Sequence, residues 1–150
     1  MARPPAARPP PPPTAPDEVE AQFYEALQQA DLDLLMTLWG DDDEVACVHP
    51  NGARVVGPAA IRASFEAIFA GGPVVAQPAS VRRLTSLSHA VHHVDERVMV
   101  RTPDGFTEAW VHTTHVFAKT AQGWRLVLHH ASPASDASPA VAAEGPSTLH

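Results

Sequence analysis

Apolar residues recur at helical spacing in three stretches of the first half of the chain, residues 17–30, 32–39 and 57–70. Asp17 and Glu20 are typical of a capped start for the first stretch, and Gly40 closes the second. Pro58 suits the first turn of the third. The apolar positions of the first are Val19, Phe23, Ala26, Leu27 and Ala30. The spacing predicts three helices, each with one buried stripe.

Strand patterns separate the second helix from the third and fill the chain after residue 80. Residues 44–49 and 54–56 flank Asn51-Gly52, which is a strong hairpin signal. The later segments cover residues 81–87, 90–101, 106–119 and 123–133. Because short turns join them, we expect consecutive antiparallel neighbours. The sequence therefore predicts an α+β fold in which three N-terminal helices pack on a curved antiparallel sheet.

Composition delimits the folded part of the chain. Eight of the sixteen prolines lie in residues 1–16, and Ser, Pro and Ala dominate residues 134–150. Segments of this kind bury little apolar surface, so both are expected to be disordered tails around one domain at residues 17–133. A single cysteine, Cys47, excludes an internal disulfide.

Charge and hydropathy narrow the choice of partners. The net charge of -7 argues against nucleic acid, because binding to phosphates requires a basic surface. The sequence has no apolar run long enough to span a bilayer and no secretory signal at its start, so we expect a cytoplasmic protein without a membrane partner.

Alternation along the strands assigns side chains to two faces of the sheet. One set in residues 90–101 carries His92 and Glu96 between apolar residues, and the other set carries three charges. On the neighbouring strands we expect the larger aromatics to face inward, with a bulge able to switch either assignment. The polar-lined pocket predicted in this way consists of His92, Glu96, Trp110, His112, Trp124 and His130. The outer face would carry Val91, Met99, Val111, Phe117 and Val127, which suits a second subunit.

Three local patterns resemble a known family. They are Cys-Val-His-Pro-Asn-Gly at residues 47–52, Val-Gly-Pro-Ala-Ala-Ile at 56–61, and Gly-Trp-Arg-Leu-Val-Leu-His-His-Ala-Ser-Pro at 123–133, with Glu96 between the last two. Together they resemble the SnoaL-like branch of the nuclear transport factor 2-like superfamily, to which ketosteroid isomerase also belongs. The resemblance implies a cone closed by helices, and a homodimer formed across the outer sheet face. It further implies either acid-base chemistry without an organic cofactor, or binding and oligomerisation alone.

Three residues are candidates for catalysis. His49 ends a strand before a turn, where it would reach the mouth of the cone, or it hydrogen-bonds a backbone carbonyl and fixes the hairpin. His130 is either a pocket residue or a satisfied core histidine. Glu96 in an apolar cone would pair with a neighbour or act as a base with a raised pKa. The only tyrosine, Tyr24, lies beside the apolar stripe of its helix, and no inward aspartate matches the base of ketosteroid isomerase.

The remaining candidates would form the pocket wall. Trp39, Trp110 and Trp124 are core residues or a flat wall for a hydrophobic ligand, with His92 and His112 beside them. A metal held by His49, His92, His112 and His130 is a minor alternative, and we expect no metal and no cofactor. The leading hypothesis is therefore a SnoaL-like homodimer that binds a hydrophobic small molecule, either as a pure binder or with cofactor-free acid-base chemistry of the isomerase, cyclase or hydratase type. The other hypothesis is a non-catalytic association module whose cone is filled by side chains.

Overall fold

The three predicted helices are present in the computed structural model, which describes residues 12–134. They are α1 (Pro16–Gln29), α2 (Leu32–Thr37) and α3 (Pro58–Ala70). Asp31 caps α2, since its carboxylate accepts a hydrogen bond from the Leu34 amide. The predicted tails lie mostly outside the described residues, in residues 1–11 and 135–150. None of the helices in the described part is long and apolar enough to cross a membrane.

Six strands form one sheet with the order β2-β1-β6-β5-β4-β3. Their bounds are β1 (Ala46–Val48), β2 (Arg54–Val56), β3 (Ala76–Thr85), β4 (His89–Thr102), β5 (Gly105–Thr120) and β6 (Gly123–Pro133). The last four strands pair as antiparallel neighbours, and β1 and β2 form the hairpin predicted around Asn51-Gly52. One pairing was not predicted. Strand β1 runs parallel to β6, which makes the sheet mixed.

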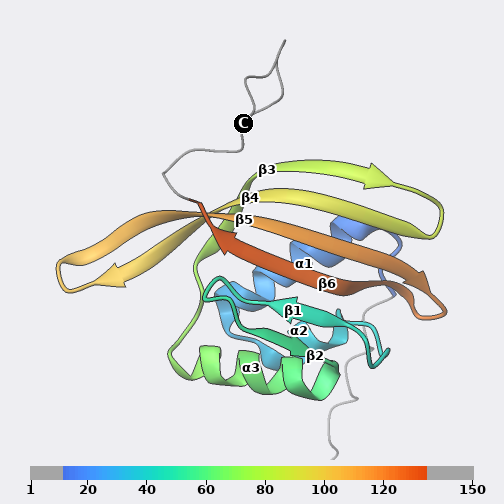
Figure 1. The fold of residues 1–150 in the computed structure, drawn as a ribbon, viewed down its shortest axis with the longest axis horizontal. Helices are drawn as coiled ribbons and strands as arrows, with labels where there is room; N and C mark the ends of the chain where they lie inside the picture. The colour runs from blue at the N-terminus through green and yellow to red at the C-terminus, as the bar shows by residue number, and fades with distance from the viewer. Residues whose placement is uncertain (1–11, 135–150) are drawn as a thin grey trace, which may run out of the picture.

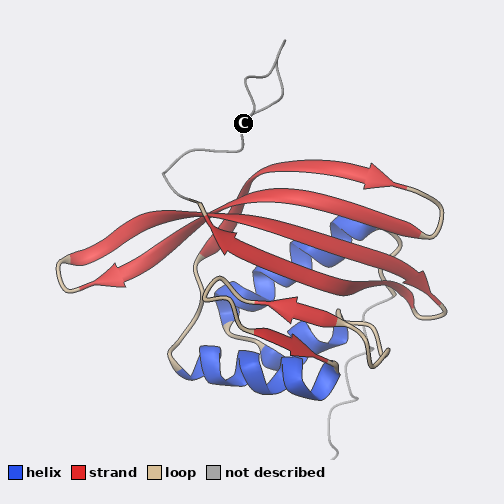
Figure 2. Ribbon diagram, in the orientation of Figure 1, coloured by secondary structure: helices blue, strands red, loops and turns tan. Residues whose placement is uncertain are grey.

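The predicted α+β class is confirmed, with the helices packed on one side of the curved sheet. Figure 1 shows α1 lying across the concave face of the long strands, with α2, α3 and the β1-β2 hairpin closing the lower end. Figure 2 shows the long β4-β5 hairpin extending beyond the helices as an arm. The core between the layers is built on residues such as Phe23, Leu35, Phe117 and Leu126, which are at most 1% exposed.

The predicted inner face of β4 is correct, whereas that of β5 is wrong. Ala90, His92, Val94 and Glu96 are all buried. On β5 the buried set is Val111, Thr113, His115 and Phe117, and His112 is exposed on the outer face. His92 pairs with His115 in the register of the two strands, so both project toward the helices. The outer face expected for Val111 and Phe117 is therefore incorrect as well.

A bulge in β6 explains why His130 is not inside the cone. The register between β5 and β6 shifts after Val116, which pairs with Leu128, so that Phe117 pairs with Leu126 and Val127 is the extra residue. Before the bulge Trp124 and Leu126 are buried, as predicted. After it the alternation is inverted, so that His129 is buried and His130 is exposed.

Candidate functional site

An apolar cavity of about 370 Å³ lies between the sheet and the helices, lined by residues of α1, α3, the β1-β2 turn and strands β3 to β6. This volume falls in the range of small-molecule pockets. Most of its wall is apolar, from Phe23 and Leu27 on α1 to Val98 on β4. Three titratable side chains line it, namely His49, Glu96 and His129. Such a site can bind an apolar ligand and present ionisable groups to it.

The structure brings only some of the predicted site residues to this cavity. His49, Glu96 and Trp110 line it. The predicted inward positions of His112 and His130 are wrong, because the strand faces described above turn both outward. The other predicted wall residues are buried elsewhere: Trp39 and Trp124 belong to the core cluster, and His92 lies against Phe117 with its ring centroid 4.8 Å away.

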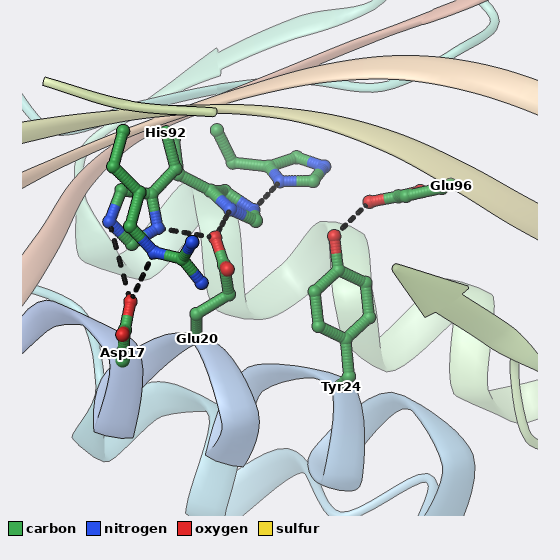
Figure 3. Close-up of polar contacts among 8 residues, drawn as sticks. Asp17, Glu20, Tyr24, His92 and Glu96 are labelled. Carbon is green, nitrogen blue, oxygen red and sulfur yellow. Dashed lines mark hydrogen bonds and ion pairs between the residues drawn. The ribbon is translucent and has the colours of Figure 1, made fainter. Parts of the chain in front are cut away.

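Glu96 is held by the tyrosine of α1. The Tyr24 hydroxyl donates a 2.6 Å hydrogen bond to Glu96 Oε2, as Figure 3 shows. Burial raises the pKa of Glu96, because an ionised carboxylate is poorly solvated there, while the Tyr24 hydrogen bond acts in the opposite direction. Glu96 is therefore a buried carboxyl group whose neutral form is favoured and whose position is fixed from α1.

His129 is connected through His115 to a carboxylate on α1. Glu20 Oε2 lies 2.9 Å from His115 Nδ1, and His115 Nε2 lies 2.9 Å from His129 Nδ1. When His115 is neutral, its Nδ1–H donates to Glu20 and its Nε2 accepts from His129 Nδ1–H. The second nitrogen of His129, Nε2, then carries a lone pair, and no hydrogen bond to it is found among the described residues.

Burial fixes the protonation of this second histidine. Loss of hydration lowers the pKa of His129 well below its usual value, and positive charge on His115, His49 or His130 would lower it further. His129 is thus a neutral imidazole near pH 7, with a basic nitrogen in the wall of the cavity.

His49 lies where the hairpin meets α3. Its Nε2 is 3.0 Å from Ser64 Oγ, and the Ser64 hydroxyl donates to the carbonyl of Ile61. The Ser64 oxygen therefore accepts from His49 Nε2–H. Burial lowers the pKa of His49. Its partner is a hydroxyl group and not the backbone carbonyl that was one of the two alternatives for this residue, and its ring lines the cavity.

The sequence interpretation missed four side chains that shape this site, namely Glu20, Tyr24, His115 and His129. One signal was available on α1, since Glu20 and Tyr24 are four residues apart and border the apolar stripe on the same face. His115 belongs to the alternating set of β5 residues that was not chosen as the inner face, although alternation alone did not exclude it. His129 had no signal, because alternation without a bulge places it outside.

The hypothetical metal site made of four histidines does not form. His112 and His130 lie on the outer face, away from His49 and His92. Across residues 12–134, no group of three His, Cys, Asp or Glu side chains has the arrangement of a metal site. Cys47 is buried beside His49, and burial raises the pKa of its thiol to about 12, which keeps it protonated.

Comparison with solved structures finds the same fold in proteins of several organisms. A protein of Thiobacillus denitrificans named as a candidate calcium/calmodulin-dependent protein kinase type II association domain is 36% identical, with a TM-score of 0.74, and the match covers 84% of this chain and 99% of that one. A candidate dehydratase of the NTF2-like family from Streptomyces avermitilis is 25% identical, with a TM-score of 0.72 over 80% and 94% of the two chains. The hub of S. rosetta CaMKII is 24% identical, with a TM-score of 0.64 over 81% and 99%.

The comparison with curated proteins finds no match. The sequence profile of the SnoaL-like domain, in contrast, matches residues 17–136, which include every helix and strand described above except the first residue of α1. The resemblance inferred from the sequence motifs is thereby confirmed, and the chain belongs to the SnoaL-like domain family.

Proposed function

We propose that this protein binds an apolar small molecule in its cone and catalyses a proton transfer on it without a cofactor. The observation that carries the proposal is the cavity of about 370 Å³, in whose apolar wall the titratable groups are His49, Glu96 and His129. An enclosed apolar wall binds the body of a ligand, and a few convergent polar groups orient its reacting end.

Opposite pKa shifts suggest the roles of two of these groups. Burial raises the pKa of Glu96 and lowers that of His129, so the carboxyl group holds a proton more tightly than an exposed one does and the imidazole holds one more weakly. Two titratable groups whose pKa values are shifted in opposite directions often serve as the acid and the base of one active site. His129 Nε2 would remove a proton from the carbon next to a carbonyl group. Glu96 would donate a hydrogen bond to the oxygen on which negative charge develops.

His49 completes the proposed site from the other side. It lines both the cone cavity and a second hollow between α3 and the β1-β2 hairpin. Its Nε2–H is directed to Ser64, which fixes the ring beside the hairpin, where it would hold the polar end of a ligand. Isomerisation, cyclisation and dehydration all begin with a proton removal of this kind.

The proposed proton transfer is tested with 2-tetralone, a flat apolar ketone. NMR in D₂O follows the exchange of its carbon-bound hydrogen for deuterium. We expect the protein to accelerate exchange next to the carbonyl. Glu96→Gln and His129→Gln should each lower this acceleration by at least about 100-fold, because each removes a positioned acid or base. His130→Gln is the matched control, since His130 is the adjacent histidine on the outer face.

Binding is measured in the same samples by saturation transfer from protein to ketone. Ala109→Phe should abolish it, because Ala109 lines the cavity and the larger ring would fill it. If the wild type binds 2-tetralone without accelerating exchange, catalysis is excluded for this ketone class and binding stands. If neither binding nor exchange depends on Ala109, Glu96 or His129, the proposed site is wrong.

A second candidate function is self-association, favoured by the 36% identity to a protein named as a candidate association domain. The outer sheet face carries exposed apolar side chains, with Leu84 66% and Met99 38% exposed. A homodimer across this face would cover them. We expect light scattering at micromolar concentration to give twice the chain mass, and Leu84→Glu to give the monomer mass. A monomer in the wild type would contradict the dimer.

A further inference from the structure

A continuous line of ionisable side chains crosses the core from the cavity to the surface. From the cavity, the contacts run from His129 Nδ1 to His115 Nε2 at 2.9 Å and from His115 Nδ1 to Glu20 Oε2 at 2.9 Å. They continue from Glu20 Oε2 to His92 Nδ1 at 2.9 Å and from His92 Nε2 to Asp17 Oδ1 at 3.7 Å. Figure 3 shows Asp17 and Glu20 rising from α1 on either side of His92.

The inner members of this line are inaccessible to water, whereas its end is not. His115 is 0% exposed, His92 1% and Glu20 5%. The side chain of Asp17 is 61% exposed, and Arg83 Nε lies 2.8 Å from its Oδ1. Burying this many ionisable groups is costly, and burying them in one line gives each a proton-exchanging partner.

We propose that Glu20, His115 and His92 form a proton path that connects the cavity base His129 with solvent at Asp17. The inference builds on the proposed function, because exchange of a ligand hydrogen with solvent requires that the proton taken up by His129 be replaced by one from water before the ligand is protonated again. These three residues do not touch the cavity ligand, so their role is to position His129 and to carry its proton.

Each step moves one proton and leaves the charge balanced. When Nε2 of His129 takes up a proton, Nδ1–H of His129 passes its proton to His115 Nε2. Nδ1–H of His115 then passes its proton to the Glu20 carboxylate. Neutral Glu20 then passes its proton to Nδ1 of His92 in the tautomer that carries its hydrogen on Nε2, and His92 releases this Nε2 proton at the Asp17 end, where the carboxylate is in contact with water. The net result is one proton taken from the cavity and one given to solvent.

Other charged groups surround the path without interrupting it. Tyr24 lies one helical turn from Glu20 along α1 and donates a hydrogen bond to Glu96 on β4. Negative charge on Glu20 raises the pKa of Glu96, and positive charge on His115 lowers it, so the path and the proposed acid influence each other. On the cavity side, positive charge on His49 or His130 lowers the pKa of His129.

The path is tested without any ligand, by NMR of imidazole N–H protons. Transfer of magnetisation from water gives the exchange rate of the His115 Nδ1–H proton. If the path operates, this proton exchanges with water faster than the backbone amides of β5 around it. His92→Phe keeps a ring against Phe117 but removes both nitrogens. It should slow the exchange by at least about tenfold, because exchange must then wait for local opening of the core.

Glu20→Gln provides an independent variant in case His92→Phe does not fold. An amide oxygen still accepts the His115 Nδ1–H hydrogen bond, but it does not take up a proton, so the exchange should slow to a similar degree. The matched control is His112→Gln. His112 lies on the same strand as His115 and its Nδ1 is 2.9 Å from Asp95, but it points to the outer face. Its replacement should leave the His115 exchange rate unchanged.

The outcomes separate the path from the proposed function. Slow exchange in Glu20→Gln, with the rate kept in His112→Gln, supports the path even if 2-tetralone is not converted. The path is overturned if the His115 exchange rate is unchanged in either His92→Phe or Glu20→Gln. It is also overturned if the wild-type rate is no faster than that of the β5 amides. Neither result bears on ligand binding. A purely structural network would lose stability in these variants without a change in exchange relative to the neighbouring amides.

Discussion

Replacement of Glu20 by alanine is expected to destabilise the protein by about 3–5 kcal/mol, because it removes one partner of a buried charged network. Glu20 Oε2 lies at hydrogen-bond distance, 2.9 Å, from both His92 Nδ1 and His115 Nδ1. Both rings are almost completely buried, so water cannot replace the lost carboxylate. These hydrogen bonds also lower the pKa of Glu20 against the effect of burial, which means that they favour its ionised form. The measurement is urea unfolding at pH 7.

The matched variants are Glu20→Gln and Glu18→Ala. Glutamine keeps an acceptor of the same shape, so we expect a smaller loss than with alanine. Glu18 is an exposed neighbour on α1 whose side chain, within residues 12–134, bonds to Thr14, and its replacement should cost much less stability than that of Glu20. Equal losses for Glu20→Ala and Glu18→Ala would show that the buried network does not contribute to stability.

The fold could be predicted from the sequence because its signals are local. Helical periodicity, the Asn51-Gly52 turn and the short connections between the long strands each act within a few residues. The parallel pairing of β1 with β6 joins segments about eighty residues apart, as in Cys47 with His129. No local pattern specifies such a pairing, so the mixed sheet was missed while the α+β class was correct.

The candidate site was predicted only where alternation is regular. On β4 the pattern assigned Glu96 and His92 to the inner face, and the structure agrees. One extra residue at Val127 inverts the end of β6, and the sequence shows no glycine or proline there that would mark a bulge. The prediction therefore selected His130 in place of its neighbour His129.

The buried network was invisible for a different reason. Glu20 on α1 is polar, so a pattern of apolar residues assigns it to the border of the buried stripe. It can be buried only because His92 and His115 face it from the sheet, and this pairing depends on how α1 lies across β4 and β5. A buried acid of this kind is predictable from the tertiary arrangement and not from the pattern along one helix.

Stability is expected to fall as the pH is lowered from 7.5 to 5.5. Burial lowers the pKa of both His129 and His49 in the folded protein, so below pH 6.5 the unfolded chain binds more protons at these positions than the folded one. Unfolding is then favoured by acid, with a limit of about 1.4 kcal/mol per pH unit for each group that titrates only when unfolded. Burial raises the pKa of Glu96, which has the opposite sign, because this group contributes stability at low pH that is lost as the pH rises. The measurement is the free energy of unfolding in urea at several pH values.

Two variants separate these opposing contributions. His129→Gln removes the group whose pKa is lowered most, so the loss of stability on acidification should become smaller. Glu96→Gln removes the only one of the three groups that is stabilised by acid, so the same loss should become steeper. His130→Gln, on the exposed side of the same strand, should change the slope less than His129→Gln, since charge on His130 is the smallest of the causes that lower the pKa of His129. If His129→Gln and His130→Gln give the same slope, His129 is not held neutral by burial, and its assignment as the base in the cavity fails with it.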